Sequence, residues 1–321
     1  MRTLWLSVVL LFATEVVAVA QSREVEVECE WGSISATIDM PECETNTAVL
    51  VVAGSGPTDR YGNSAAGLRT YCYKMLGEAL ADDGFAVMRY DKRAIGLSSY
   101  PVERIPSLVF GDFVDDARRC VEFLHNEGFE RIIVVGHSEG GLIAQVLAAE
   151  ESTKVDGIVL LCATGCTMDE LLFHQLSQQL VPAYMGLMMR SNNILRSLKR
   201  GEQVPLEEIP EELYGLFHPT VQPFLISTMQ YDPVAYAKEC RCPALVVVGG
   251  RDVQITVQDG ERLKAALPDA EMVIFENMAH VLKDTATSDR VEQMLSVYSD
   301  AQLPLTEGLS RTITKFINEL K

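Results

Sequence analysis

Positive charge is scarce in this 321-residue chain, in which 27 Lys and Arg residues stand against 45 Asp and Glu residues. The formal net charge is −18 at pH 7. An acidic surface repels phosphate backbones and anionic membranes, so we expect no nucleic-acid partner. Repeats and low-complexity segments are absent as well. With 48% hydrophobic and 22% charged residues, the composition is that of a globular protein with a large core.

Long hydrophobic runs are missing everywhere except at the N-terminus. Residues 1–20 have the features of a secretory signal: Arg2, an apolar stretch from Leu4 to Ala13, and small residues at 18–20. The stretch is interrupted by Glu15 and is shorter than the roughly 20 residues that span a bilayer. We therefore expect cleavage before Gln21, export to the periplasm or the medium, and no stable membrane insertion of the mature chain. A retained N-terminal anchor is the alternative.

Pairs of metal ligands at zinc-site spacing are also lacking. The chain has eight cysteines, and two close pairs occur, Cys162 with Cys166 and Cys240 with Cys242. No second pair of Cys or His accompanies either one, so we expect no metal. Export would permit disulfides, but the spacing predicts no particular pairing.

The pattern of apolar residues predicts an α/β fold. Alternation on either side of Gly32 indicates an antiparallel hairpin. Short apolar runs without polar alternation follow, as expected of strands buried on both faces, and they alternate with helical stretches at 68–84 and 113–128. The runs are 47–54, 85–91, 131–136, 157–163, 244–250 and 271–277. We predict a doubly wound, mostly parallel sheet.

One segment interrupts this alternation. Residues 167–230 are rich in Met, Leu and Gln, contain several prolines, and show no convincing strand. The predicted organisation is a core of residues 21–166 and 231–321 with a helical cap of residues 167–230. Because ligands of open α/β sheets bind at the carboxyl ends of the strands, we expect the cap to lie over those ends.

The stretch "VVGHSEGGLI" at 134–143 places several glycines around one serine. Gly136 to Gly140 matches G-x-S-x-G, with a predicted strand before it and a predicted helix after it. This is the context of a nucleophile elbow, a turn so tight that only small residues fit beside the serine. A phosphate-binding loop is the alternative, but such a loop would favour glycine at position 138. Ser138 is therefore the candidate nucleophile.

A serine nucleophile needs a histidine base, itself oriented by a carboxylate. Four of the five histidines are poor candidates for this base because of their positions. His125 ends a predicted helix, His137 is inside the elbow, and His174 and His218 belong to the predicted cap. His280 follows a late strand on a loop and is the candidate base.

The chain order Ser, acid, His places the acid between 138 and 280. Asp252 fits best because it comes directly after a buried strand, whereas Asp232, Asp259 and Asp269 are rivals on loop or helix positions.

The developing oxyanion needs backbone donors. The N–H of Glu139 is one, and the loop "VVAGSGPTDR" at 51–60 should supply the other, for which we select the N–H of Ser55. The carboxylate of Glu139 is expected to face solvent, although a peptidase would use it to attract a free amino group. The charged clusters at 59–60 and 91–93 are expected either to brace the oxyanion loop or to bind a substrate carboxylate.

Several motifs in order resemble the α/β-hydrolase superfamily, and within it exported bacterial esterases and serine-aminopeptidase-like hydrolases. They are "AGSGPTDRYGN" at 53–63, "RYDKRAIGLS" at 89–98, "GHSEGG" at 136–141, "LFHPTVQPFLISTMQYDP" at 216–233, "GGRDVQI" at 249–255 and "MAHVLK" at 278–283. The resemblance implies the same triad and oxyanion donors. Two positions depart from it: Ala53 stands where many relatives have His, and Ala94 where the loop often has Gly.

Together these features predict a serine hydrolase that cleaves carboxylic esters through an acyl-enzyme, without cofactor or metal. The expected partner is a small-molecule ester, or a short peptide if the enzyme is an aminopeptidase. A non-catalytic binding protein on the same fold is the third hypothesis. Four glutamates of the predicted cap are candidates for binding the free amino group of a peptide substrate, but an exposed helical face explains them more simply. They are Glu207, Glu208, Glu211 and Glu212. The sequence does not predict the oligomeric state.

Overall fold

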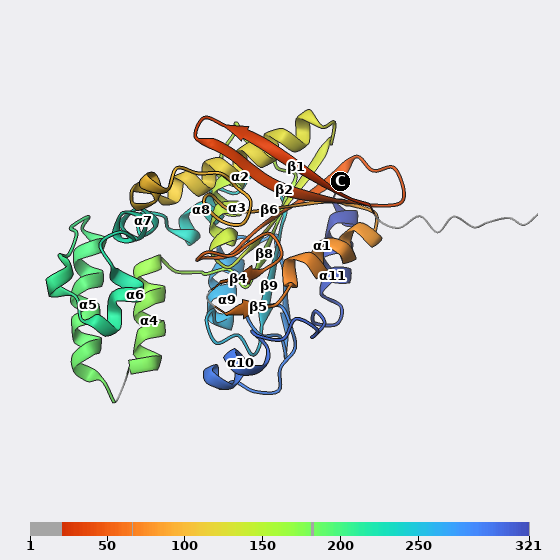
Figure 1. Cartoon of the computed structure of the whole chain (residues 1–321). Helices are drawn as coiled ribbons and strands as arrows, with labels where there is room; N and C mark the ends of the chain where they lie inside the picture. Colours follow the sequence, from red (N-terminus) through yellow and green to blue (C-terminus); the bar gives the residue numbers. More distant parts are fainter. Residues whose placement is uncertain (1–20, 66, 181–182, 321) are drawn as a thin grey trace, which may run out of the picture.

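The computed structural model of the chain describes residues 21–65, 67–180 and 183–320. Its centre is an eight-stranded sheet with the order β1-β2-β6-β3-β7-β8-β9-β10 (Figure 1). The strands are β1 Gln21–Cys29, β2 Gly32–Met40, β3 Thr47–Val52, β6 Ala86–Tyr90, β7 Arg131–His137, β8 Gly157–Leu161, β9 Ala244–Gly249 and β10 Glu271–Phe275. A separate hairpin consists of β4 Asn63–Ser64 and β5 Leu68–Arg69. The predicted signal, residues 1–20, lies outside the described residues.

The sheet confirms the prediction of a mostly parallel, doubly wound sheet with an antiparallel hairpin at its start. The β1–β2 hairpin is antiparallel and joins β6 in antiparallel register, and from β6 to β10 every neighbouring pair is parallel. Each predicted strand is present with ends within two residues of those expected. The parallel strands direct their carboxyl ends to one edge, where the loops of the candidate site gather.

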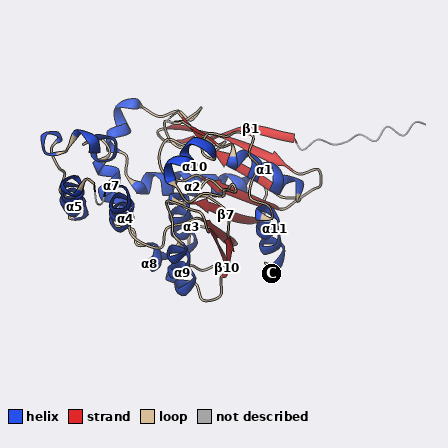
Figure 2. Ribbon diagram, turned by 90° about the horizontal axis from the view of Figure 1, so that it is seen from below, coloured by secondary structure: helices blue, strands red, loops and turns tan. Residues whose placement is uncertain are grey.

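Helices cover both faces of the sheet (Figure 2). On one face pack α1 Cys72–Asp82 and α11 Leu309–Glu319. On the other pack α2 Phe110–Asn126, α3 Glu139–Ala149, α8 Pro233–Glu239 and α9 Val257–Ala266. The helix expected at 68–84 begins later, at Cys72, because Leu68 and Arg69 pair with β4 instead. A short helix, α10 Arg290–Ser296, precedes α11.

The chain between β8 and α8 forms the predicted helical insertion. Its helices are α4 Met168–Leu180, α5 Met185–Lys199, α6 Tyr214–Phe217 and α7 Gln222–Thr228, and 3₁₀ turns occupy Leu206–Glu208 and Glu211–Leu213. These helices share a hydrophobic cluster of their own and stand beside the sheet in both views (Figures 1 and 2). They join the core near Phe110, whose N–H donates to Ser227 Oγ at 2.7 Å. Another 3₁₀ turn, Val102–Ser107, precedes α2.

All eight cysteines are free thiols. In the described part of the chain, no helix has the length and apolarity needed to cross a bilayer.

Candidate active site

Ser138 lies at the turn between β7 and α3, as the elbow motif predicts. Its backbone has φ 55° and ψ −118°, a conformation that non-glycine residues rarely adopt. The flanking glycines are required by space. A Cβ on Gly136 would lie 2.2 Å from the carbonyl oxygen of Gly140, and a Cβ on Gly140 would lie 2.2 Å from that of Val52. The turn therefore holds Ser138 in a strained position at the carboxyl edge of the sheet.

His280 and Asp252 form the predicted pair. His280 Nδ1 lies 2.7 Å from Asp252 Oδ2, and the Asp252 side chain is completely buried. The other carboxylate oxygen accepts hydrogen bonds from the N–H groups of Gln254, at 2.7 Å, and Ile255, at 2.9 Å. Both carboxylate oxygens of Asp252 are thus held by hydrogen bonds. When the proton of the His280 ring is on Nδ1, Nε2 is free to accept a proton from a substrate or from Ser138.

Of the three rival acids, two cap helices and the third is exposed. Asp232 accepts hydrogen bonds from the N–H groups of Val234 and Ala235 at the start of α8. Asp259 closes the first turn of α9 with Thr256, and Asp269 is an exposed loop residue.

The elbow and the His280 loop are in direct contact. The ring of His137, the residue before Ser138, lies 4.7 Å from the ring of His280, and His137 Nε2 lies 2.8 Å from the His280 carbonyl oxygen. Among the described residues, the Ser138 side chain has no hydrogen-bond partner. Such a bond to the base commonly tightens only when substrate is bound.

The predicted oxyanion loop packs against the nucleophile. A Cβ on Gly54 would lie 3.1 Å from Ser138 Cβ. The N–H of Gly54 donates to Tyr73 Oη at 3.0 Å, and its carbonyl accepts from Lys92 Nζ at 2.6 Å. Glu139 is the first residue of α3, so its N–H has no intrahelical acceptor. The candidate donors are therefore the N–H of Ser55, which follows Gly54 directly, and the N–H of Glu139, which follows Ser138 directly.

The side chain of Glu139 is not where we expected it. Instead of facing solvent it is only 6% exposed, and it lies in the electrostatic field of Lys92. Burial raises the pKa of the Glu139 carboxyl, and Lys92 opposes that rise. The reason is the helix direction: the first turn of α3 enters the core immediately, and all residues from Glu139 to Ala148 are buried.

The two charged clusters brace the loops. Arg60 is buried, and its side chain pairs with Asp91 at 2.9 Å while its N–H donates to the same carboxylate. Arg93 pairs with Asp116 through two hydrogen bonds of 2.7 and 2.8 Å. These cations are therefore engaged with carboxylates of the chain itself rather than open to a substrate.

Tyr73 and His137 are site residues that the sequence analysis missed as such. Tyr73 Oη lies 2.7 Å from His137 Nδ1, and both side chains are buried. Burial, and then the neighbouring His280, lower the pKa of His137 to about 3, so the ring is neutral. The sequence shows that residue 137 is a histidine, but it does not show what the ring binds. Its partner, Tyr73, is 64 positions away, and no spacing rule connects the two residues.

One cluster has the residue types of a metal site. Atoms of Cys162, Asp252 and His280 lie within 4.8 Å of one another. Two of these residues are already joined by the hydrogen bond between Nδ1 and Oδ2. The cluster thus consists of the candidate acid and the candidate base with one buried thiol beside them.

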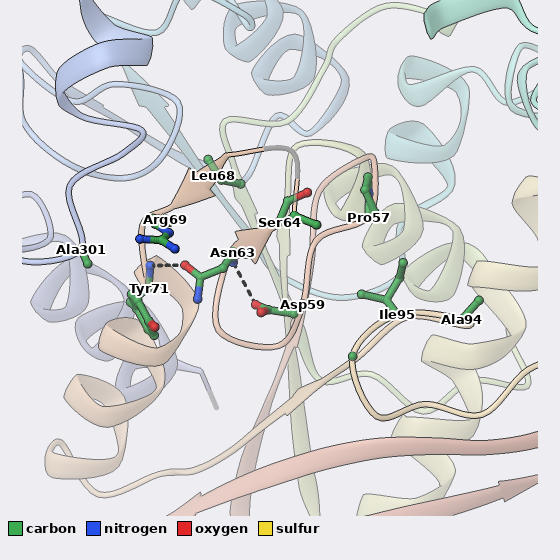
Figure 3. Close-up of a pocket in the computed structure, with 12 residues that line it drawn as sticks. Pro57, Asp59, Asn63, Ser64, Leu68, Arg69, Tyr71, Ala94, Ile95 and Ala301 are labelled. Carbon is green, nitrogen blue, oxygen red and sulfur yellow. Dashed lines mark hydrogen bonds between the residues drawn. The ribbon is translucent and has the colours of Figure 1, made fainter.

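A pocket of about 580 Å³ opens next to the oxyanion loop (Figure 3). Pro57 and Asp59 line it from the loop after β3, and residues 94–96 line it from the loop after β6. Asp59 Oδ1 accepts from the N–H of Asn63, whose side chain in turn accepts from the N–H of Tyr71. Since β6, β3 and β7 are parallel neighbours, the pocket opens at the same sheet edge as Ser138.

Curated proteins with similar sequences include esterases. Esterase EstD of Thermotoga maritima is 27% identical over 264 residues, which cover 80% of this chain and 60% of EstD. The pimeloyl-[acyl-carrier protein] methyl ester esterase of Chromobacterium violaceum is 29% identical over 157 residues, 46% of this chain and 62% of that protein. The chain thus spans about three fifths of the length of each of these relatives.

Solved structures share the fold. The esterase Pf2001 of Pyrococcus furiosus superposes with a TM-score of 0.59 at 18% identity, covering 94% of this chain and 91% of that one. Est1E of Butyrivibrio proteoclasticus, solved with ferulic acid bound, gives 0.60 at 15% identity, covering 92% and 98%. At this level of identity the likeness concerns the fold.

A family model matches residues 67–284, which hold the elbow, the helical insertion, Asp252 and His280. The turn that holds Ser138 and the chain order Ser138, Asp252, His280 agree with the general pattern of α/β-hydrolases. The chain belongs to the serine aminopeptidase, S33 family of α/β-hydrolases.

Proposed function

We propose that the protein hydrolyses carboxylic esters through an acyl-enzyme. Ser138 attacks the ester carbonyl while Nε2 of His280 takes the hydroxyl proton, and Asp252 holds the imidazole by its bond to Nδ1. The N–H groups of Ser55 and Glu139 bind the oxyanion. His280 then returns the proton to the departing alcohol, and a water molecule attacks the acyl-enzyme to release the acid. The observation that carries the proposal is the strained Ser138 backbone at φ 55° beside the 2.7 Å His280–Asp252 pair.

A small or medium-sized ester suits this site best. The pocket of about 580 Å³ beside the oxyanion loop has the size of a small-molecule site and opens at the same sheet edge as Ser138, although no residue of the proposed triad lines it. The curated relatives are named as esterases, and Est1E was solved with ferulic acid, a small aromatic acid. These similarities favour an ester over a peptide as substrate.

An aminopeptidase activity has less support from the residues at the site. It needs an accessible carboxylate for the substrate amino group, whereas that of Glu139 is buried near Lys92. The four glutamates of the insertion are exposed on short 3₁₀ turns, where acidic side chains are usual.

The test compares two substrate series on the chain from Gln21 onward. One series is p-nitrophenyl esters of graded acyl length, the other aminoacyl p-nitroanilides, and Ser138→Ala is the control. We expect ester turnover that is lost in the variant, with an optimum at short or medium acyl length. Turnover of anilides alone would establish the peptidase. Failure of both series, with no labelling of Ser138 by a fluorophosphonate, would leave a binding protein.

We also propose that the chain is exported. The support is the sequence of residues 1–20, with Arg2, an apolar stretch and small residues before Gln21. Expression of the whole chain in a bacterium, followed by fractionation and N-terminal sequencing, should find a mature protein that begins at Gln21 outside the cytoplasm. A cytoplasmic protein with an intact N-terminus would contradict the proposal.

A further inference from the structure

Lys92 is a buried cation without an ion-pair partner. It follows β6, is 4% exposed, and forms no salt bridge within 4.0 Å among the described residues. Its hydrogen bond goes to the carbonyl oxygen of Gly54, at 2.6 Å, and the Phe113 ring lies 5.8 Å from Nζ. Burial lowers the pKa of Lys92, which the charge of Glu139 partly offsets. Burying an unpaired charge is costly, so a role that compensates for the cost is expected.

The carbonyl that Lys92 binds belongs to the same peptide unit as the N–H of Ser55. A peptide unit is planar and almost always trans, so its C=O and its N–H point in opposite directions. A cation that fixes the direction of the Gly54 oxygen therefore fixes the direction of the Ser55 N–H on the other side. It also polarises the unit, which makes that N–H a stronger donor.

The other polar backbone group of Gly54 is held as well. The N–H of Gly54 donates to Tyr73 Oη at 3.0 Å, so both polar backbone groups of Gly54 are bound by buried side chains. The loop packs on the nucleophile, because a Cβ on Gly54 would lie 3.1 Å from Ser138 Cβ. An alternative peptide orientation would lose the bond to Lys92 and leave its ammonium group buried without an acceptor.

We infer that Lys92 is a positioning residue of the oxyanion hole: its ammonium group orients the Ser55 N–H through the shared Gly54–Ser55 peptide unit. The positive charge also favours the negative oxygen of the tetrahedral intermediate at longer range. This inference rests on the proposed function, in which Ser55 is an oxyanion donor. It assigns Lys92 to the transition state and not to recognition of a substrate carboxylate.

The test is Lys92→Met, with Lys238→Met at an exposed lysine of α8 as the matched control. A misdirected oxyanion donor acts on the transition state alone, so kcat for a p-nitrophenyl ester should fall about 10- to 100-fold while KM changes less than twofold. The affinity for a trifluoromethyl ketone, which mimics the tetrahedral intermediate, should fall by a similar factor. Lys238→Met should match the wild-type protein. Lys92→Arg, which retains a cation, should keep more of kcat than Lys92→Met.

Two outcomes overturn the inference: a folded Lys92→Met protein with wild-type kcat, or one whose KM rises while kcat is unchanged. The second outcome would assign Lys92 to substrate binding. Should Lys92→Met not fold, Lys92→Gln, which keeps a shorter neutral donor, is measured against the same two outcomes. The proposed function fails separately, if the wild-type protein is inactive or if Ser138→Ala remains active.

Discussion

The hydroxyl of Tyr73 lies 2.7 Å from Nδ1 of His137 and thereby links the loop after β3 to the elbow that holds Ser138. The carbonyl of His280 can only accept, so the neutral His137 ring carries its proton on Nε2 and donates it to that carbonyl, at 2.8 Å. Nδ1 of His137 therefore accepts the proton of Tyr73, which itself accepts from the N–H of Gly54. A continuous series of hydrogen bonds thus runs from the oxyanion loop to the backbone of the base.

Tyr73→Phe breaks this series. The variant leaves the Gly54 N–H and His137 Nδ1 without partners, which costs about 1–3 kcal/mol of unfolding free energy. The oxyanion loop also loses one of its two supports, so we expect kcat to fall about tenfold with KM little changed. Urea unfolding and steady-state ester kinetics measure both, with the exposed Tyr184→Phe as control. A Tyr73→Phe protein equal to that control in both measurements would argue against the positioning role.

The buried His137 predicts a loss of stability in acid. Its pKa is about 3 in the folded chain, against an ordinary value near 6.5 in the unfolded chain. Above pH 6.5 the ring is neutral in both states and contributes nothing. Below it the unfolded chain binds a proton that the folded chain does not, so stability falls, by about 2 kcal/mol at pH 5.

His137→Asn removes this titrating group and should flatten the pH dependence of unfolding between about pH 6.5 and 4.5 relative to the wild-type protein. The comparison concerns the slopes, since the variant also changes the absolute stability. Parallel curves for the two proteins would show that His137 is not the group that titrates.

Gly140 should tolerate no side chain. The added Cβ of Gly140→Ala would lie 2.2 Å from the carbonyl oxygen of Val52, so the elbow must shift, and we expect a loss of about 3 kcal/mol or more together with most of the activity. Gly186→Ala in α5 is the matched control, because its Cβ would meet nothing within 4 Å. There, in the exposed first turn of the helix, we expect a change of less than about 0.5 kcal/mol. Equal thermal unfolding of the two variants would contradict the geometry of the turn.

Asp252→Asn tests the orientation of the base. The amide keeps the size of the side chain but removes the negative charge that holds the Nδ1 proton, so the imidazole loses the tautomer that can accept at Nε2. We expect kcat to fall by about 10³- to 10⁴-fold with the fold retained. Asp232→Asn, at the start of α8, should keep its kcat. A small effect at Asp252 and a large one at Asp232 would reverse the assignment of the acid.

The sequence was sufficient to predict the strands because those of the parallel sheet are apolar runs bounded by turns. β3, β6 and β8 are buried at every position, and such strands need no alternation. The elbow, Asp252 and His280 were predictable for a related reason, since each follows a strand and the carboxyl ends of parallel strands meet at one edge.

Contacts between distant side chains could not be predicted. Tyr73 lies within an ordinary helical pattern, and nothing in its spacing indicates a bond to His137. Lys92 and Glu139 are charged residues, which are usually exposed, and only the packing of α3 and the loop after β6 buries them. Ala94 differs from these residues, because the sequence already marked it as a departure from the motif that it resembles. The structure adds that Ala94 has a φ of 60°, a conformation that favours glycine.

The most direct test of the account is to identify the residue that becomes covalently modified. The protein would be treated with a fluorophosphonate, digested, and the adduct located by mass spectrometry, with Ser138→Ala and His280→Ala treated in parallel. We predict one adduct, on Ser138, that is absent in Ser138→Ala and forms far more slowly in His280→Ala. An adduct on another residue, or labelling of Ser138 that does not depend on His280, would contradict the proposed acyl-enzyme mechanism.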